Sequence, residues 1–252
     1  MANVDRAAYL DAVQRESIGL LTAARGADPA APVPGCPDWT TNDLVWHIGE
    51  VHDFWSYVVR ERSLAPDYDD PERPGRGLGA SEETEALHTF ASERAAELHR
   101  VLSDADPSTP VWTWTSQQDV AFVLRRSAHE TAMHRVDAEH AARRVHRIDP
   151  PLAADGIDEF LTFFAPVVRP DAPAPAGSVH IHCTDADGEW VIRIGDDGEH
   201  LVTREHAKAD TAIRGDAHDV LMALWRRAAL DTVDVVGDRS VAEAFVARAR
   251  NA

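Results

Sequence analysis

Residues 40–58 read TTNDLVWHIGEVHDFWSYV, and this stretch predicts the fold of the first half of the chain. Thr40 stands three positions before Asp43, which is the spacing of a capping box, with Asp in place of the usual Glu or Gln. Apolar residues then follow in steps of three and four, the period of a helix with one buried face: Leu44, Ile48, Val51, Phe54, Trp55 and Val58. The stretch therefore predicts an amphipathic helix that packs against other helices.

Three further helices are predicted around this one. Asp5 can cap a helix that ends near Gly26, another runs over about residues 81–102, and a last one over about residues 119–145. Residues 67–79 are rich in Pro, Gly and Asp, which indicates a long loop. Four helices with one long crossing loop predict a four-helix bundle.

The pattern changes near residue 148, where we expect a second domain to begin. Residues 179–183 alternate between apolar and polar, Asp187-Gly188 is typical of a hairpin turn, and residues 190–194 alternate again. This half predicts an α+β domain with a mostly antiparallel sheet. Its remaining elements are three helices, over 154–164, 216–225 and 241–249, and three strands, over 201–203, 211–214 and 233–236. The predicted domains are therefore residues 1–148 and 149–252.

Charge and composition exclude several classes of partner. The 252 residues hold 25 Lys and Arg against 43 Asp and Glu, a net charge of −18, so we expect no binding to nucleic acid or to anionic membranes. No apolar run reaches the length of a membrane helix, and the N-terminus lacks the pattern of a signal peptide, so we expect a cytoplasmic protein. Two cysteines, Cys36 and Cys183, exclude a disulfide framework and a four-cysteine zinc site.

Three side chains with metal-binding chemistry are predicted to point into the bundle. His47 shares the apolar face of its helix, and Glu130 and His134 lie one turn apart on the inward face of the last helix. Two histidines and a glutamate are a known ligand set of catalytic zinc, and helix bundles commonly hold metals between facing helices. The same spacing also suits a buried Glu–His ion pair and a hydrogen-bonded core histidine, and both alternatives stay open.

Other polar residues carry weaker signals. Asp137 can orient a ligating histidine, or it can pair with a nearby arginine. His180 and His182 share one face of a predicted strand, and we expect this face to meet solvent. Cys36 lies between prolines in a predicted loop, and nothing near it in the sequence indicates a reactive thiol.

Several motifs resemble those of the mycothiol-dependent maleylpyruvate isomerase family. In the first half they are WTTNDLVWH at 39–47 and HETAMHRVD at 129–137; in the second half they are ADTAIRG at 209–215, LWRR at 224–227 and VVGD at 235–238. The resemblance implies a DinB-like four-helix bundle followed by a small sterol-carrier-like α+β domain.

The resemblance also implies a chemistry. The family's zinc ligands fall on His47, Glu130 and His134, and zinc would bind the thiol of mycothiol and deprotonate it. That thiolate would attack a small electrophile, either to isomerise a maleylpyruvate-type double bond or to remain attached as in an S-transferase. An arginine of the second domain would hold a substrate carboxylate; Arg227 is our candidate, and Arg226 is adjacent.

Other functions remain open beside this one. The chain can be a metal-binding or ligand-binding protein without turnover, including a carrier of an apolar ligand in the second domain. The same three ligands also suit a hydrolase that uses zinc-bound water. The sequence does not identify the substrate or the oligomeric state.

Overall fold

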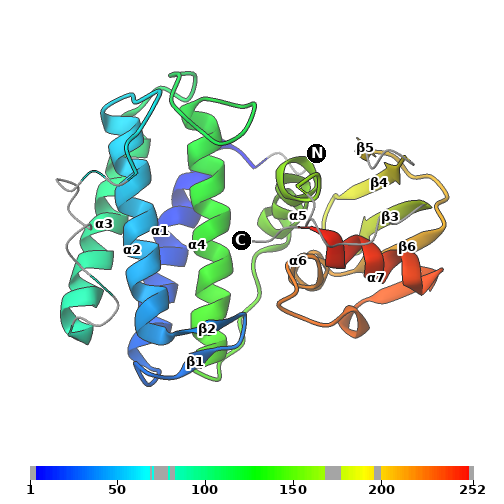
Figure 1. Cartoon of the computed structure of the whole chain (residues 1–252), viewed down its shortest axis with the longest axis horizontal. Coiled ribbons are helices and arrows are strands. Elements are labelled where there is room, and N and C mark those ends of the chain that lie inside the picture. Colours follow the sequence, from blue (N-terminus) through cyan, green and yellow to red (C-terminus); the bar gives the residue numbers. More distant parts are fainter. Residues whose placement is uncertain are drawn as a thin grey trace. The chain divides into compact units, whose positions relative to one another are not determined.

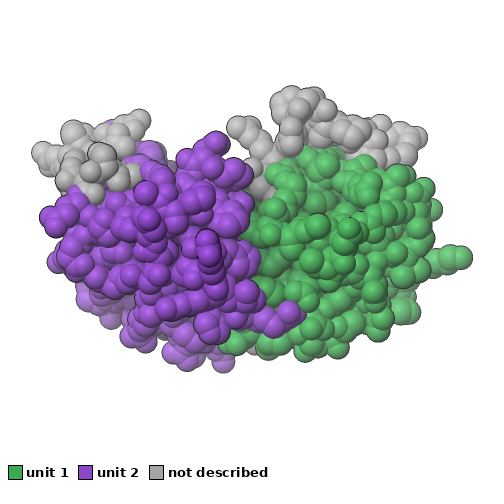
Figure 2. Space-filling model, turned by 90° about the horizontal axis from the view of Figure 1, so that it is seen from below, with its two compact units in different colours: residues 1–4, 148–252 green, residues 5–147 purple. Residues whose placement is uncertain are grey.

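The computed structural model describes residues 4–68, 70, 79, 83–167, 177–195 and 200–249. The chain divides into two compact units, coloured separately in Figure 2. Residues 5–147 form the helical unit, and residues 148–252 make up nearly all of the second, which we call the sheet unit. None of the described helices combines the length and the apolar character that a membrane crossing requires.

The helical unit is a four-helix bundle, as predicted. Figure 1 shows its four helices side by side: α1 (Arg6–Arg25), α2 (Thr41–Arg60), α3 (Thr84–Asp104) and α4 (Val120–Ala141). Helix α1 packs against α3 and α4, and α2 packs against the same two helices. Gly49 permits the close approach of α2 and α3, because a Cβ atom there would lie 2.5 Å from the ring of Phe90.

The predicted caps fix where these helices begin. The Asp5 side chain accepts a hydrogen bond from the backbone of Ala8, and Thr40 and Asp43 form the reciprocal capping box. Asp119 caps α4 in the same way, through the backbone N–H of Phe122. Because α4 ends at Ala141, it is about one turn shorter than predicted; Arg143 turns the chain away with a φ of 56°.

The structure adds a small hairpin where the sequence predicted a loop. Strands β1 (Pro32–Val33) and β2 (Cys36–Thr40) pair antiparallel directly before α2, at one end of the bundle (Figure 1). The predicted start of α3 at residue 81 lies outside the described residues, as does most of the predicted loop over 67–79.

The sheet unit is α+β, as predicted, with a five-stranded sheet in the order β5-β4-β3-β6-β7. All neighbouring strands are antiparallel except the parallel pair β3–β6. The strands are β3 (Gly177–Cys183), β4 (Glu189–Ile194), β5 (His200–Thr203), β6 (Thr211–Gly215) and β7 (Asp234–Gly237). The helices are α5 (Pro150–Glu159), which continues as a π-helix over Phe160–Phe164, α6 (Ala217–Leu224), a 3-10 turn (Leu230–Thr232) and α7 (Arg239–Arg248).

The start of α5 was predicted wrongly. Helix α5 begins at Pro150, whereas the sequence predicted a start at residue 154, after Pro150 and Pro151. Proline is tolerated in the first helical turn, where its missing N–H would have no partner within the helix.

The two faces of the β3–β4 ribbon differ in character. Val179 pairs with Ile192 and Ile181 pairs with Trp190, and all four side chains are buried. The alternate residues of β3, His180 and His182, therefore stand on the opposite face of the sheet.

Candidate metal centre

The structure brings the three predicted ligands together. His47 comes from α2, and Glu130 and His134 come from α4. The Nε2 atoms of His47 and His134 lie 3.3 Å and 3.2 Å from the same oxygen, Oε1 of Glu130. We call these three residues the helical cluster.

The spacing of the helical cluster fits a divalent metal such as zinc. Tetrahedral zinc with bonds of about 2.0–2.1 Å holds its ligand atoms about 3.3 Å apart, which is close to the separations above. The three ligand atoms all lie within 4.8 Å of one another. The His47 and Glu130 side chains are 26% and 23% exposed, so a small molecule can reach the cluster from solvent.

Two further residues hold the ligands in place. Arg126 forms an ion pair with Oε2 of Glu130, which leaves Oε1 directed at the two histidines. Asp137 is fully buried, and its Oδ2 lies 3.0 Å from Nδ1 of His134. A carboxylate behind a ligating histidine fixes the ring and its tautomer, which is the orienting role predicted for Asp137.

These contacts set the charges in the cluster. Burial alone would raise the pKa of Glu130, but the charge of Arg126 and hydrogen bonds from His134 and His47 lower it well below its usual value. Burial alone would lower the pKa of His134, but Asp137 and Glu130 raise it to about 9. Without an ion, His134 is therefore protonated at neutral pH, and a metal would have to displace that proton.

The β1–β2 hairpin supplies one wall of the site. The ring of Trp39 lies with its centroid 4.6 Å from that of His47 and 5.8 Å from that of His134. The Cys36 thiol lies 3.8 Å from Oδ2 of Asp137, so Cys36, His134 and Asp137 form a second possible ligand group. Sequence reasoning gave neither Cys36 nor Trp39 a place at the site, because it predicted a loop there.

His52 is buried, although it follows His47 by five residues and so points about 140° away from it around the helix. Its Nε2 lies 3.0 Å from Oγ1 of Thr131. Burial lowers the pKa of His52 to about 4, so this imidazole is neutral at neutral pH. The hydroxyl of Thr131 accounts for its place in the core.

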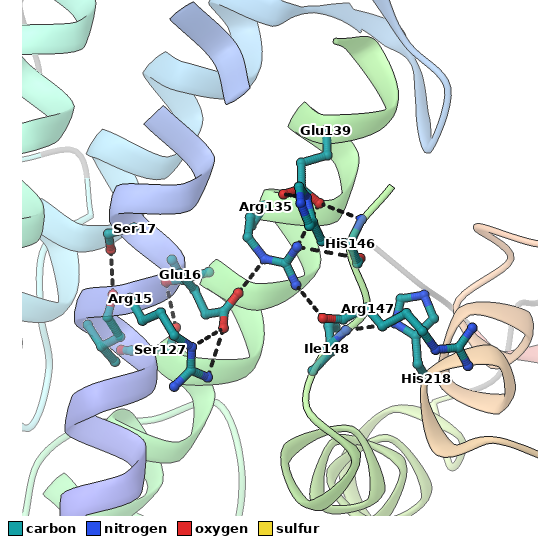
Figure 3. Close-up of polar contacts among 12 residues, drawn as sticks. Arg15, Glu16, Ser17, Ser127, Arg135, Glu139, His146, Arg147, Ile148 and His218 are labelled. Atoms are coloured by element: carbon teal, nitrogen blue, oxygen red, sulfur yellow. Dashed lines mark hydrogen bonds and ion pairs between the residues drawn. The ribbon is translucent and has the colours of Figure 1, made fainter. Parts of the chain in front are cut away.

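A buried ion-pair network fixes the neighbouring face of α4 (Figure 3). Arg135 pairs with Glu16 on α1 and with Glu139 on its own helix. Its guanidinium also donates to the backbone oxygens of His146 and Arg147, at 3.5 and 3.2 Å. The network joins α1, α4 and the segment that follows α4.

The predicted substrate arginine belongs to the sheet unit and follows α6. Arg227 lies with its guanidinium carbon 5.9 Å from the centroid of the Trp225 ring. Arg226 has a φ of 56°, and it donates to the backbone oxygens of Val246 and Ala249, near the end of α7. Arg227 also donates to the backbone oxygen of Trp225, at 3.4 Å, so both arginines make contacts within the sheet unit. Arg227 remains our candidate for the substrate carboxylate.

Comparisons with known proteins agree with this architecture. The family model for the mycothiol maleylpyruvate isomerase N-terminal domain matches residues 10–139, and the model for the MDMPI C-terminal domain matches residues 151–244. Crystal structures of the mycothiol-dependent maleylpyruvate isomerase and of its histidine-to-alanine mutant share the fold. Each is 12% identical, with a TM-score of 0.65, over 92% of this chain and 93% of that chain. No curated protein sequence matches the chain.

Proposed function

The chain belongs to the mycothiol maleylpyruvate isomerase family, and from this premise we propose that it is a zinc-dependent enzyme that uses mycothiol. In this proposal a thiolate attacks a small electrophile, in maleylpyruvate-type isomerisation or in S-transfer. His47, Glu130 and His134 would hold the zinc ion.

One observation carries the proposal: two imidazole nitrogens from different helices converge on a single carboxylate oxygen at 3.2–3.3 Å. A simple buried ion pair needs only one histidine. The alternative of a hydrogen-bonded core histidine describes His52, which is buried and contacts the hydroxyl of Thr131 through Nε2, better than it describes the helical cluster.

The protein's own residues prepare this site for thiol chemistry. A bound zinc ion would act as a Lewis acid and keep a coordinated thiol deprotonated at neutral pH, whereas the pKa of a free thiol is near 8.5. Arg126 pairs with Oε2 of Glu130, which leaves Oε1 for the zinc ion that the cluster would hold. Asp137 accepts a hydrogen bond from Nδ1 of His134, which leaves Nε2 directed at the same position. Trp39 packs beside the two imidazoles, with its ring centroid 4.6 Å from that of His47 and 5.8 Å from that of His134.

The thiolate would then act in one of two ways. Added to a cis double bond, it leaves a single bond that rotates, and its elimination gives the trans product. If the thiolate instead displaces a leaving group, it stays attached, which is S-transfer. We propose that Arg227 pairs with a carboxylate of the substrate, because a guanidinium binds a carboxylate through two parallel hydrogen bonds.

The test compares metal content and turnover in three proteins. The untagged wild-type chain, His134→Ala and His140→Ala are purified without chelator, analysed for zinc, and assayed with maleylpyruvate and mycothiol. His140 lies on the same helix as His134 and outside the cluster, so His140→Ala is the matched control. Circular dichroism verifies that each variant is folded.

The proposal predicts about one zinc ion for the helical cluster in the wild type and in His140→Ala. His134→Ala loses this ion, and its mycothiol-dependent turnover falls by at least about 100-fold, since a ligand matters at least as much as the residues behind it. A folded His134→Ala protein that binds one zinc ion fewer than wild type and keeps its turnover would disprove the mechanism.

A further inference from the structure

A second group of metal-binding side chains lies in the sheet unit. His180 and His182 stand on one face of β3, and Glu189 opens β4 directly opposite His182. His206 follows β5 and reaches the same carboxylate. We call these four residues the sheet cluster.

Strand register explains why three of the four meet. Directly paired residues on antiparallel strands have neighbouring side chains, and the diagonal neighbour on the same face is also within reach. Glu189 is paired with His182 and diagonal to His180, whose own partner is Val191. The loop after β5 then adds His206 from the edge of the sheet.

All three imidazoles contact the same oxygen of Glu189. The distances to Oε1 are 2.9 Å from Nε2 of His180, 3.0 Å from Nδ1 of His182 and 2.5 Å from Nδ1 of His206. One carboxylate oxygen has two lone pairs, so three hydrogen bonds exceed what it accepts well. A cation suits three nitrogens and one anionic oxygen better than a shared hydrogen bond does.

The chemistry of the donors defines the ion. Imidazole nitrogen with one carboxylate suits zinc and its transition-metal neighbours, whereas calcium and magnesium prefer all-oxygen sites. Zinc needs ligand atoms about 3.3 Å apart, so the distances from Oε1 to the three nitrogens would grow by less than about 1 Å. The His182 ring would also have to approach the other ligands, because its nitrogens lie outside the group of ligand atoms within 4.8 Å of one another.

We propose that the sheet cluster is a zinc-class metal site, formed by His180, Glu189 and His206 with His182 as a fourth ligand. The ion would fasten the loop after β5 to the β3–β4 ribbon, since the His206 side chain is 82% exposed and contacts the sheet through Glu189. The first three residues place their ligand atoms within 4.8 Å of one another. This site does not depend on the proposed enzymatic function.

The test counts zinc ions in the full-length chain after chelator treatment. Zinc chloride is titrated by calorimetry, in competition with a chromogenic chelator, into wild type, His47→Ala/Glu130→Gln and His180→Ala/His206→Ala. His200→Ala is the control, because it removes an imidazole from β5 of the same sheet and outside the cluster. Glu189→Gln is a second variant, which changes the anionic ligand and keeps its volume.

We expect His47→Ala/Glu130→Gln and His200→Ala to keep the ion of the sheet cluster. His180→Ala/His206→Ala should bind one ion fewer than wild type, and Glu189→Gln should bind this ion at least about 10-fold more weakly. Zinc should also raise the melting temperature of His47→Ala/Glu130→Gln and leave that of His180→Ala/His206→Ala less affected.

Two results would overturn the inference: no zinc bound by folded His47→Ala/Glu130→Gln, or an unchanged zinc count in His180→Ala/His206→Ala. The same titration tests the two clusters independently of each other. If wild type binds a single ion that only His180→Ala/His206→Ala removes, the sheet cluster is a metal site and the zinc mechanism proposed above fails.

Discussion

The helical cluster and the sheet cluster are both built from histidines around one glutamate, but they differ in the residues that surround them. In the helical cluster a buried aspartate stands behind one histidine and an arginine holds the free oxygen of the glutamate. In the sheet cluster three histidines share one carboxylate, and the last of them is largely exposed. The further charges around the helical cluster pre-align its side chains for chemistry. The sheet cluster lies on a ribbon and a loop, and its His206 is 82% exposed, so it is suited to fastening a surface segment.

The comparison predicts that the largest loss of stability follows from removing a buried charge in the helical unit. Arg135→Met should lower the free energy of unfolding by up to about 3–5 kcal/mol, because Glu16 and Glu139 stay buried and keep only their contacts with Arg15 and His146. Urea unfolding measures this effect. Arg100→Met removes two exposed ion pairs on α3, with Glu97 and Asp104, and is the control. Equal losses of stability in the two variants would contradict the prediction.

A buried histidine should make the helical unit sensitive to acid. The pKa of His52 is about 4 in the folded protein and about 6.5 when unfolded, so the unfolded chain takes up the proton first as the pH falls. The contribution of His52 to the free energy of unfolding is fully present above about pH 6.5. It is lost between pH 6.5 and 4, by up to roughly 3 kcal/mol. Unfolding of wild type and His52→Asn across this range isolates the effect; identical pH profiles would argue against it.

Removing the charge of Asp137, which lies behind His134, should weaken zinc binding at the helical cluster alone. Asp137→Asn keeps the shape of the side chain but loses the charge that orients His134, so zinc affinity at the helical cluster should fall about 10–100-fold. Zinc binding at the sheet cluster serves as the internal control and should not change. Calorimetric titration of wild type and Asp137→Asn separates the two sites.

The smallest effect is expected on the exposed side of the sheet. Arg193 on β4 is 45% exposed and pairs with Glu205 at 2.9 Å. Because exposed ion pairs are screened by water, Arg193→Gln should leave the melting temperature unchanged within error. A clear loss of stability in thermal unfolding would show that this face of the sheet is more tightly organised than the exposures indicate.

The sequence predicts the helical cluster better than the sheet cluster. Glu130 and His134 are one helical turn apart, so their shared direction could be predicted from spacing alone, as could the caps at Thr40 and Asp119. The meeting of His206 with Glu189 depends on strand register and on the path of a loop, which no local pattern encodes. The prediction that His180 and His182 simply face solvent therefore missed their common partner.

The remaining differences have similar physical causes. The β1–β2 hairpin forms from a segment rich in proline. The apolar residues of this segment show neither the alternation of a strand nor the period of a helix, so the sequence did not predict the hairpin. His52 lies off the apolar face of its helix by angle, but Thr131 on α4 offers it a hydrogen bond in the core. Contacts between distant segments decide both cases, and the first of them places Trp39 at the candidate metal centre.

The Arg135 network has a geometric consequence for its neighbour on α4. Adjacent residues on a helix point about 100° apart, so Arg135 faces α1 while His134 faces the ligand position. A turn of α4 about its own axis by about 20° would swing an atom about 6 Å from that axis through about 2 Å. Metal ligands tolerate only about 0.2 Å. By anchoring one face of α4 to α1, the arginine sets the rotational alignment of the helix and so aims Glu130 and His134 at His47.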